Sequence, residues 1–399
     1  TLDTTRITEY LNVESGSFST NDGLVLHSDA NGTGSILDLS NGAVNGDVIM
    51  QRYVPAGETG WRFLTSPIVG QTVGDWNDDF TTAGFVGSHY PSFPFESIQG
   101  YDESVAGPST NGFTTITSAT SLAAGEGFWV WSGDASWGTT DFTIDLVGAI
   151  NNDDIGMPVS FSNGTHADDG WCLVGNPYPC PIDWDDSDWT KTNMDNAVYI
   201  WNTQTISYAS YVGGVGNNGG SNNISSSQGF FVKANAASPV LTAREGVKST
   251  NLADPFLKAG SANNVFRLNI KHMDTTLADQ VTFNVKDNGN FDFDGQEDAY
   301  KLFNENGQLN IYTKSQDGSD LSINTVPLGA DVELEIFVQF TEPGSYQLDL
   351  VDEGGLSGFD CITIRDEKTG LAHNITSGTS FTVVGSDIGM YRHRFTIIG

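Results

Sequence analysis

One pattern occurs twice in the chain, as Gly60-Trp-Arg-Phe-Leu-Thr-Ser-Pro67 and, 110 residues later, as Gly170-Trp-Cys-Leu-Val-Gly-Asn-Pro177. A second pattern follows each copy, first as Gly125-Glu-Gly-Phe-Trp-Val130 and again 102 positions later as Ser227-Gln-Gly-Phe-Phe-Val232. Aromatic and β-branched residues favour strands, and proline has no N–H for a ladder, so it ends the opening strand. Two elements that return in the same order indicate a duplicated β-unit.

The duplication predicts two similar units, which we place at residues 51–158 and 159–258. Each opens with a tryptophan strand that stops at proline and closes with a strand of glycine, aromatic residues and valine. Large apolar side chains of strands usually lie in the core. We therefore expect the equivalent residues to superpose and to be buried as two pairs, Trp61 with Trp171 and Phe128 with Phe230.

Strand patterns continue beyond the repeat, in short runs at 265–270, 281–285, 332–338 and 346–350. No long stretch has an apolar face at helical period, so helices are expected only as short turns, such as one near 185–193. The chain is therefore predicted to be all-β, with tandem, jelly-roll-like β-sandwich domains. A polar segment with proline and glycine at 251–263 predicts a linker before a C-terminal sandwich at 259–399.

The first 50 residues have shorter and more closely spaced runs, at 10–13, 23–26, 35–39 and 47–50. Two interpretations stay open for this segment, 1–50: the last coils of a β-solenoid, or an edge sheet of the next domain. The chain begins with threonine and lacks a signal-peptide pattern. We expect it to be a mature or excised portion of a longer protein.

Charge limits the partners of this protein. The chain has 50 acidic and 17 basic residues, for a net charge of −33, and 11% of its residues are aromatic. Nucleic acid and anionic membranes require clustered basic residues, so both are excluded as expected partners. No apolar run has the roughly 18 residues that a membrane span needs. The aromatic content predicts a folded chain, and the negative charge favours divalent cations.

The strongest chemical signal is a possible calcium loop in the C-terminal region. Calcium loops place oxygen ligands at positions 1, 3, 5 and 9 and a glycine at position 6. Here these positions are Asn290, Asp292, Asp294, Asp298 and Gly295. Position 12 is a lysine where an EF-hand has glutamate, so we expect a Ca2+ site within a β-domain. The alternative is an acidic surface turn whose Phe291 and Phe293 pack inward.

Other polar patterns are less specific. Tryptophans beside Asp and Asn are typical of sugar-binding surfaces, although core packing is the commoner role of a tryptophan in a sheet; they are Trp76, Trp137, Trp184, Trp189 and Trp201. The acidic stretches 75–79, 151–154 and 183–188 are expected to be solvated loops. The GxGxxG match at 214–219 precedes no helical pattern, so we expect a flexible loop. No catalytic motif is evident, and we expect no enzyme.

The three cysteines are too few for a disulfide scaffold. Cys172 and Cys180 flank a turn that is compatible with a disulfide, which an exported protein would permit. Cys361 lies in an apolar strand pattern and is expected to be a buried free thiol.

Several of these motifs together resemble a known group of proteins. Gln51-Arg-Tyr-Val54 before the first repeat, Leu173-Val-Gly-Asn-Pro-Tyr-Pro179 and Gln228-Gly-Phe-Phe-Val-Lys233 look like motifs of large secreted surface proteins of the Bacteroidota. Those proteins leave the cell by the type IX secretion system. The region from Phe266-Arg-Leu268 to Arg394-Phe-Thr-Ile397 is similar to the segment before their sorting signal. A sorting tail with terminal basic residues is not evident.

The resemblance implies an extracellular or cell-surface, adhesin-like protein and brings no catalytic residues with it. We therefore expect a structural or adhesive module of a larger bacterial surface protein, stabilised by calcium. Its expected partners are neighbouring domains of the same polypeptide or surface assembly, and glycans. Two alternatives remain: a carbohydrate-binding accessory region of a secreted polysaccharide-degrading enzyme, and a filament subunit whose ends, 1–50 or 391–399, add strands to a neighbour.

Overall fold

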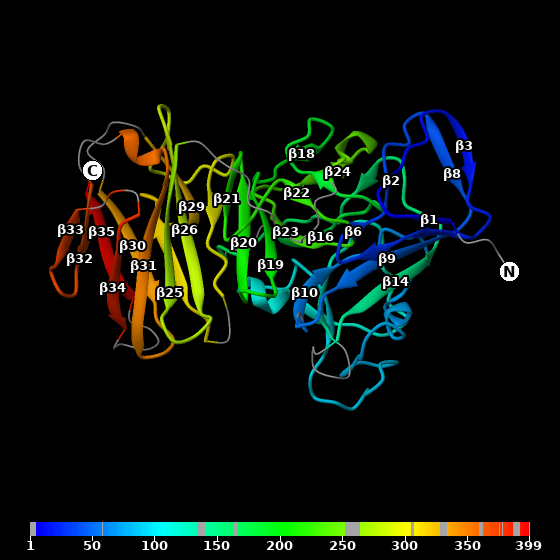
Figure 1. Ribbon diagram of the computed structural model, residues 1–399, viewed down its shortest axis with the longest axis horizontal. Coiled ribbons are helices and arrows are strands. Elements are labelled where there is room, and N and C mark those ends of the chain that lie inside the picture. Colours follow the sequence, from blue (N-terminus) through cyan, green and yellow to red (C-terminus); the bar gives the residue numbers. More distant parts are fainter. Residues whose placement is uncertain are drawn as a thin grey trace. The chain divides into compact units, whose positions relative to one another are not determined.

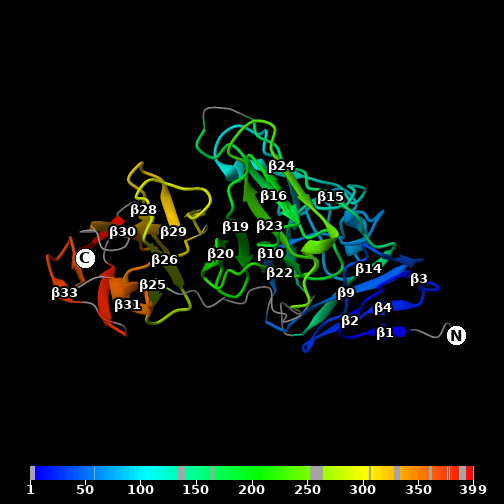
Figure 2. The same cartoon turned by 90° about the horizontal axis from the view of Figure 1, so that it is seen from above.

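The computed structural model forms two compact units, shown in Figures 1 and 2. The N-terminal unit comprises Thr1–Asp195 and Asn222–Lys258, and the C-terminal unit comprises Asn196–Ser221 and Ala259–Gly399. The structure describes residues 5–57, 59–133, 140–162, 166–251, 264–304, 307–327, 333–358, 362–374, 376, 378–385 and 392–398. The predicted linker at 251–263 therefore lies outside the described residues, apart from Asn251.

The protein is all-β, as predicted. Helical structure in the described residues is limited to four 3-10 turns, η1 (Val73–Trp76), η2 (Ser109–Gly112), η3 (Glu245–Val247) and η4 (Gly355–Gly358). The helical turn expected near 185–193 is wrong, because that stretch consists of tight turns followed by strand β18 (Thr190–Thr192). Within the described residues, no helix is long and apolar enough to cross a membrane.

The N-terminal segment is built from stacked parallel strands. Strand β1 pairs in parallel with β4, and β4 pairs in parallel with β9, while β2 pairs with β7 and β3 with β8 in the same parallel manner. The strands of this segment are β1 (Thr5–Ile7), β2 (Tyr10–Leu11), β3 (Gly16–Ser19), β4 (Leu24–Leu26), β5 (Ser28–Asp29), β6 (Gly32–Thr33), β7 (Ser35–Ile36), β8 (Gly42–Asn45) and β9 (Val48–Val54). Three ladders that repeat in chain order are the arrangement of a β-solenoid.

The observed segment has features of both interpretations, the β-solenoid and the edge sheet. Successive coils stack closely: a Cβ at Gly42 would lie 1.9 Å from the carbonyl oxygen of Val13, so only glycine fits there. The last coil also belongs to the next element, because β9 pairs antiparallel with β14 (Phe142–Gly148). The coils therefore continue directly into the first repeat.

The two repeats form equivalent strand pairs. In the first, β10 (Gly60–Leu64) pairs antiparallel with β13 (Phe128–Ser132), and Leu64 lies opposite Phe128. In the second, β16 (Trp171–Gly175) pairs with β23 (Gly229–Lys233), and Val174 lies opposite Phe230. The other strands are β11 (Ile98–Tyr101), β12 (Phe113–Thr115), β15 (Ile155–Gly156), β17 (Ile182–Asp183), β22 (Asn223–Ile224) and β24 (Val240–Ala243). The duplicated sequence thus has a duplicated register.

The repeats also contact each other reciprocally. Leu64 of the first repeat bridges Gln228 of the second, and Val174 of the second bridges Glu126 of the first. These four residues are two equivalent pairs, since Leu64 corresponds to Val174 and Glu126 corresponds to Gln228 in the sequence repeat. Two similar units that make the same contact in both directions are related by a two-fold axis. The two repeats are therefore related by an approximate two-fold axis within the N-terminal unit.

Burial agrees with the predicted core roles at three of four positions. Phe128, Phe230 and Trp171 are buried, whereas Trp61 is only partly buried. The expectation that both tryptophans are core residues is therefore wrong for Trp61. The reason is uneven cover on the face opposite to Leu64: Phe63 is buried there against Phe231 at 5.2 Å, whereas Trp61 lies against the exposed Phe95 at 5.4 Å.

The second repeat is tied to the coils by a buried ion pair. The carboxylate of Glu245 accepts hydrogen bonds from the backbone N–H of Leu39, at 2.7 Å, and from Nζ of Lys248, also at 2.7 Å. The Lys248 side chain is fully buried and lies 4.7 Å from the ring centroid of Tyr178. Because Glu245 of this buried ion pair also binds the backbone of Leu39, the pair holds the coils against the second repeat.

The C-terminal unit is one long sheet that surrounds a single core. Its strand order is β33-β32-β35-β30-β28-β29-β26-β25-β31-β34, and β27 pairs with β29. Residues of β25, β26, β28, β30 and β31 supply most of the core. The strands are β25 (Val265–His272), β26 (Ala278–Lys286), β27 (Ala299–Tyr300), β28 (Asn310–Lys314), β29 (Asp320–Pro327), β30 (Glu333–Gln339), β31 (Gly344–Glu353), β32 (Thr363–Asp366), β33 (Ala372–Asn374), β34 (Ser380–Gly385) and β35 (Arg392–Ile398).

Residues 196–221 pack with this C-terminal unit, although the sequence analysis placed them in the second repeat. They form β19 (Val198–Asn202), β20 (Ser207–Val212) and β21 (Val215–Asn217). The flexible loop expected at 214–219 is wrong, because it contains β21, and Asn217 is buried with its amide on the carbonyl oxygen of Gln280 at 3.0 Å.

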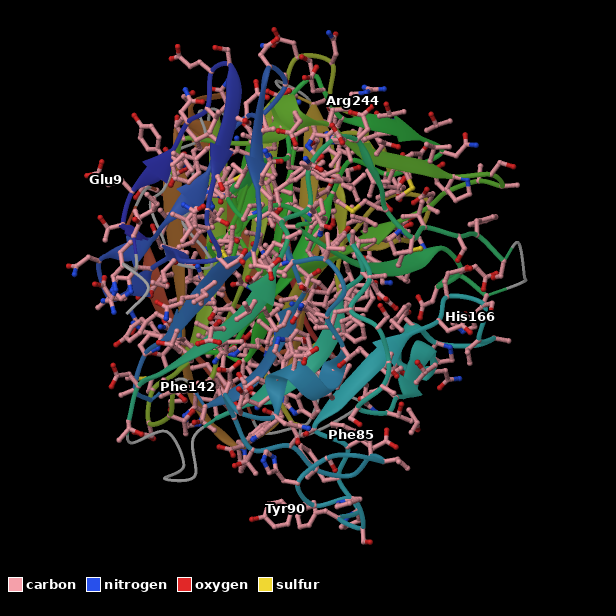
Figure 3. All side chains as sticks on the ribbon, turned by 90° about the vertical axis from the view of Figure 1, so that its right-hand side faces the viewer. Glu9, Phe85, Tyr90, Phe142, His166 and Arg244 are labelled. Carbon is pink, nitrogen blue, oxygen red and sulfur yellow. The ribbon has the colours of Figure 1, made fainter. Side chains whose placement is uncertain are left out.

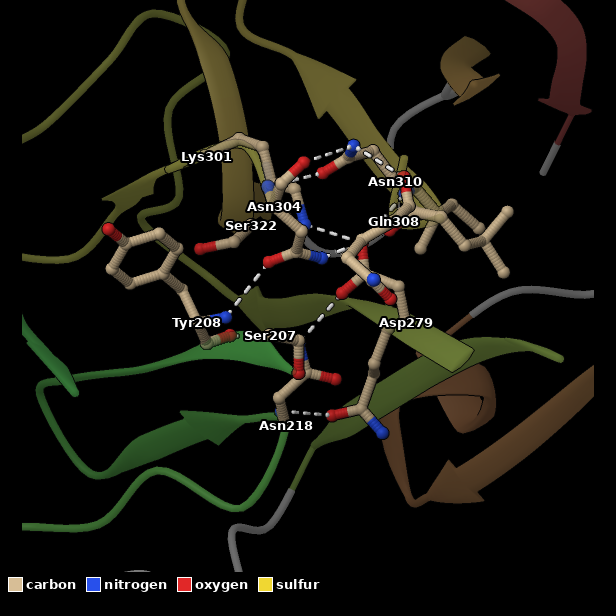
Figure 4. Close-up of polar contacts among 12 residues, drawn as sticks. Ser207, Tyr208, Asn218, Asp279, Lys301, Asn304, Gln308, Asn310 and Ser322 are labelled. Atoms are coloured by element: carbon tan, nitrogen blue, oxygen red, sulfur yellow. Dashed lines mark hydrogen bonds and ion pairs between the residues drawn. The ribbon is translucent and has the colours of Figure 1, made fainter. Parts of the chain in front are cut away.

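A buried polar network holds this segment (Figure 4). Asp279 accepts hydrogen bonds from the Asn218 side chain at 2.7 Å and from the backbone N–H of Ile311 at 2.8 Å, and it forms an ion pair with Lys301. Both charged side chains are buried. Asn304 accepts a further hydrogen bond from the backbone N–H of Tyr208, at 2.9 Å. Partners that lie this far apart in the sequence explain why the segment belongs to the C-terminal unit.

Candidate functional site

Among the described residues of the N-terminal unit, a loop of the first repeat has the most exposed large hydrophobic side chain, Val86, and three more exposed apolar or aromatic side chains close by. Its side chains Val86, Tyr90, Phe93 and Phe95 are 73%, 60%, 55% and 38% exposed, all within ten residues. We call these four residues the aromatic loop. Figure 3 shows Tyr90 at the tip of the loop and Phe85 nearer the body of the unit. Contiguous exposed apolar side chains are typical of interaction sites.

The base of the aromatic loop is held by buried contacts. Phe85 is 2% exposed and belongs to the core. The backbone N–H of Gly84 donates to the carbonyl oxygen of Tyr90 at 3.0 Å, and the Thr82 hydroxyl donates to the Asn77 side chain at 2.6 Å. The same hydroxyl accepts the backbone N–H of His89 at 3.2 Å. The loop is therefore a hydrogen-bonded projection, which presents its side chains in a fixed arrangement.

The outer face of the neighbouring sheet continues this aromatic surface. Trp61 lies opposite Trp131, and Phe63 lies opposite Trp129 across β10 and β13, so all four rings are on one face. The three tryptophans are partly exposed there, whereas Phe63 is buried against Phe231 of the second repeat. Trp61 stacks on Trp129, with 4.8 Å between ring centroids. Phe95 of the loop packs against Trp61 at 5.4 Å and against Trp131 at 5.9 Å. Phe95 therefore joins the aromatic loop to the sheet.

A polar group lies on the same face. Gln99 is opposite Trp129 on one side and opposite Thr115 on the other, so all three side chains point outward together. The Glu96 carboxylate accepts hydrogen bonds from the Thr115 hydroxyl at 2.8 Å and from the Gln99 amide at 3.3 Å. We call Glu96, Gln99 and Thr115 the polar triad. Hydrogen bonds fix its orientation beside the aromatic rings.

The four predicted calcium ligands do not converge. Asn290, Asp292 and Asp294 are exposed, whereas Asp298 is 1% exposed. Both oxygens of Asp298 accept backbone N–H groups, from Asp294 at 2.8 Å and from Thr325 at 2.6 Å. Burial raises the pKa of Asp298 to about 7. Among the described residues, no three carboxylate, histidine or cysteine side chains are grouped as metal ligands would be.

The loop is instead closed by protein contacts. Phe293 stacks on Tyr300 with 4.2 Å between centroids, and Phe291 packs against the core. The residue at position 12, Lys301, is the buried partner of Asp279. These contacts hold the loop without a metal ion, and stabilisation by calcium stays a prediction.

Calorimetry of the full chain tests the calcium prediction. If calcium binds the folded loop, the stability of the C-terminal unit should rise, by roughly 2.7 kcal/mol at a 100-fold excess over the dissociation constant. Asp294→Ala should remove most of this gain, and Asp287→Ala, at a neighbouring exposed carboxylate, should preserve it. The same melting temperature with calcium and with a chelator would contradict the prediction.

The tryptophans singled out for sugar binding are core residues wherever the structure describes them. Trp76, Trp184, Trp189 and Trp201 are at most 8% exposed. Trp137 lies outside the described residues. The partly exposed tryptophans are others, Trp61, Trp129 and Trp131, which have few acidic neighbours in the sequence. Neighbouring Asp and Asn residues in the sequence therefore did not identify the exposed tryptophans.

A pocket of about 280 Å³ opens beside the first repeat, lined by Tyr101, Asp102, Glu103, Glu126, Pro158, Val159, Ser160, Cys172 and Leu173. Glu103 accepts four hydrogen bonds, from Ser160, Ser162 and Gly170, and although partial burial raises its pKa, these bonds lower it overall. Burial raises the pKa of Glu126. Glu103 is thus a structural acceptor that fastens the segment around residues 160–170.

The cysteines described are free thiols. Cys172 and Cys180 are both buried and unbonded to each other, so the disulfide considered from the sequence is not formed. Burial raises the pKa of Cys172 to about 11 and that of Cys180 to about 12, which leaves both thiols protonated and unreactive. Cys361 lies outside the described residues.

One carboxylate of the acidic stretch 75–79 is partly buried. Asp79 accepts the backbone N–H of Asp145 at 2.9 Å. Burial raises the pKa of Asp79 from 3.8 to about 8, and the charges of Asp145 and Asp78 act in the same direction. The other carboxylates of the stretch, Asp75 and Asp78, are exposed, and Asp75 accepts a turn hydrogen bond from the backbone N–H of Thr72.

The raised pKa predicts a pH dependence of stability. Folding favours protonated Asp79, so its contribution is complete below about pH 4 and is lost as the pH rises towards 8. Asp79→Asn should therefore flatten this decline and stabilise the N-terminal unit at pH 8, on the order of 1 kcal/mol after allowance for partial exposure. Thermal melts between pH 4 and pH 8 measure the effect. Asp47→Asn is an exposed control, and equal slopes in both variants would contradict the prediction.

The described elements define an all-β protein in which parallel coils, a duplicated β-unit and a C-terminal sheet follow one another. The chain belongs to the family described as "Domain of unknown function (DUF8693)", which matches residues 10–398. Comparisons with curated proteins and with solved structures find no match.

Proposed function

We propose that this chain is a non-catalytic adhesive module of a larger bacterial surface protein, and that the aromatic loop is its contact surface. The observation that carries the proposal is the exposure of Val86, Tyr90, Phe93 and Phe95 on a hydrogen-bonded loop. The motifs shared with secreted surface proteins of the Bacteroidota support a location outside the cell. The net charge of −33 is compatible with that location and disfavours anionic partners.

The aromatic loop contributes little to folding through its exposed side chains. Phe85 already anchors the loop to the core, and the polar contacts of Thr82 and His89 fix its base. Exposed apolar surface has an unfavourable hydration free energy, which binding to a partner would recover. A function in contact formation therefore explains why side chains at Tyr90 and Phe93 are apolar, whereas a purely structural loop would tolerate polar residues there.

The adhesive function is tested with beads that carry the full chain. We expect beads to adhere to at least one of a panel of surfaces coated with hydrocarbon, collagen, cellulose or mannan. Tyr90→Ser/Phe93→Ser should abolish most of this adhesion and leave the melting temperature unchanged, because both side chains are exposed. Tyr10→Ser is the matched control, since Tyr10 is 51% exposed on the coils. Adhesion that the double variant retains in full would contradict the proposal.

A carbohydrate-binding accessory region is the second candidate. The polar triad favours it, because a carboxylate, an amide and a hydroxyl are held beside aromatic rings on the outer face. This candidate differs from the first in the chemistry of the partner and in the residues that contact it.

A further inference from the structure

We infer that the outer face of the first repeat binds a neutral polysaccharide, with a sugar ring against Phe95 and Trp131 and its hydroxyl groups on the polar triad. The inference rests on the proposed adhesive function and names the class of ligand. It differs from the sequence-based sugar hypothesis, whose described tryptophans are buried. The residues involved come from β11, β12, β13 and the end of the aromatic loop.

The apolar half of the site is preorganised. Phe95 is 38% exposed, and it meets Trp131 edge-on, at an interplanar angle of 88° and a centroid distance of 5.9 Å. The backbone N–H of Trp131 donates to the carbonyl oxygen of Ser97 at 2.7 Å. This bond places Trp131 beside the segment that carries Phe95 and Glu96. Ring surfaces and polar groups are therefore adjacent because of the backbone, and no rearrangement is needed to bring them together.

The polar half of the site matches hydroxyl chemistry. The Glu96 carboxylate is an acceptor, the Gln99 amide is both donor and acceptor, and the Thr115 hydroxyl is also both. Sugar hydroxyls likewise donate and accept, so each can pair with a member of the triad. The hydrogen bonds from Gln99 and Thr115 to Glu96 fix the side chains before a ligand arrives, which lowers the entropic cost of binding.

The charge of the protein selects among polysaccharides. A chain with a net charge of −33 repels anionic polymers, and Glu96 adds a carboxylate inside the site. A neutral polysaccharide has no such penalty and offers repeated rings and hydroxyls. A protein partner would use the aromatic rings but would not need a hydroxyl-binding triad beside them. The juxtaposition of both halves therefore favours a neutral glycan.

Affinity electrophoresis of the full chain tests this inference. The gels contain hydroxyethyl cellulose, xyloglucan, galactomannan or yeast mannan, with alginate as the anionic comparison. We expect retardation in at least one neutral gel and none in alginate. Phe95→Ala and Gln99→Ala should each weaken binding roughly tenfold. Tyr10→Ala should bind as the unmodified chain does, since Tyr10 lies on the coils.

The two variants differ in how much they disturb local packing. Phe95 contacts Trp61 and Trp131, so Phe95→Ala changes local packing, whereas Gln99→Ala removes only a partly exposed side chain of the triad. Binding by both variants as strong as that of the unmodified chain, or no retardation in any neutral gel, would overturn the inference. Failure of the glycan site is distinguishable from failure of adhesion, because loop-dependent adhesion to hydrocarbon or collagen would then persist. Retardation that needs Tyr90 and Phe93 but not Gln99 would place the glycan on the aromatic loop and overturn its assignment to the polar triad.

Discussion

Asp279→Ala should destabilise the C-terminal unit by about 3–5 kcal/mol. The carboxylate is fully buried, and its removal leaves the Lys301 ammonium buried without its counter-charge. It also deprives the Asn218 amide and the Ile311 N–H of their acceptor. Breaking one partner of a buried ion pair is much costlier than breaking an exposed pair, because the remaining charge has no water around it.

Hydrogen exchange of the full chain, read by mass spectrometry, measures this effect unit by unit. Protection in β26, β28 and β20 should fall together, because Asp279 of β26 binds the Ile311 N–H of β28 and the Asn218 amide, which also donates to the Tyr208 carbonyl of β20. Asp349→Ala is the matched control, since Asp349 pairs with Lys271 at 3.7 Å near the surface. Its expected cost is within about 1 kcal/mol. A similar small loss of protection in both variants would show that the buried network is not what stabilises the unit.

Trp171→Ala should destabilise the N-terminal unit by about 3–5 kcal/mol, because it leaves a large cavity in the core. Trp171 is 3% exposed, and its ring packs edge-on against Phe231 at 6.0 Å. The equivalent Trp61 is partly exposed on the outer face. Trp61→Ala should therefore cost clearly less, about 1–2 kcal/mol, although the two residues occupy the same place in the repeat.

Urea denaturation of the two variants compares the equivalent tryptophans. The difference between them follows from burial alone, because the sequence positions and the strand register correspond. Phe128→Ala and Phe230→Ala supply the internal comparison, since both phenylalanines are fully buried and should cost similar amounts. Equal costs for the two tryptophans would contradict the assignment of Trp61 to the outer face.

The repeat shows how far local sequence predicts the fold. Strand-forming residues, glycine and proline predict the strands β10, β13, β16 and β23 from local sequence, whereas the pairing of β10 with β13 and of β16 with β23 joins distant parts of the chain. Burial of each face depends on what covers it, and no local pattern contains that information. Trp61 and Trp171 differ for this reason. The C-terminal docking of residues 196–221 was likewise not predictable, since it depends on Asp279 and Asn304 far along the chain.

The N-terminal coils also show a feature that local sequence does not predict, the pairing of the strands. Short runs and close spacing indicate either a solenoid or an edge sheet, and the observed pairing, parallel between the coils and antiparallel from β9 to β14, depends on long-range contacts. A local signal for the coils does exist. Gly42 stands where the neighbouring coil leaves no room for a Cβ.

The candidate site was also only partly visible in the sequence. The spacing of Asp292, Asp294 and Asp298 matched a calcium loop, but spacing does not fix the direction of a side chain, and Asp298 turns inward. The aromatic loop was missed because aromatic residues in a β-protein are usually buried. A useful signal was the stretch Tyr90-Pro-Ser-Phe-Pro-Phe95, in which prolines interrupt any strand that would bury the rings.

Covalent footprinting of the bound protein tests the central claim most directly. The full chain is labelled with hydroxyl radicals, once free and once adhered to a surface to which it binds. The account predicts that Tyr90, Phe93 and Phe95 lose reactivity on adhesion, because these exposed rings form the contact, whereas Tyr10 on the coils remains reactive. Unchanged reactivity of Tyr90 and Phe93 in the adhered protein, with protection elsewhere, would contradict it.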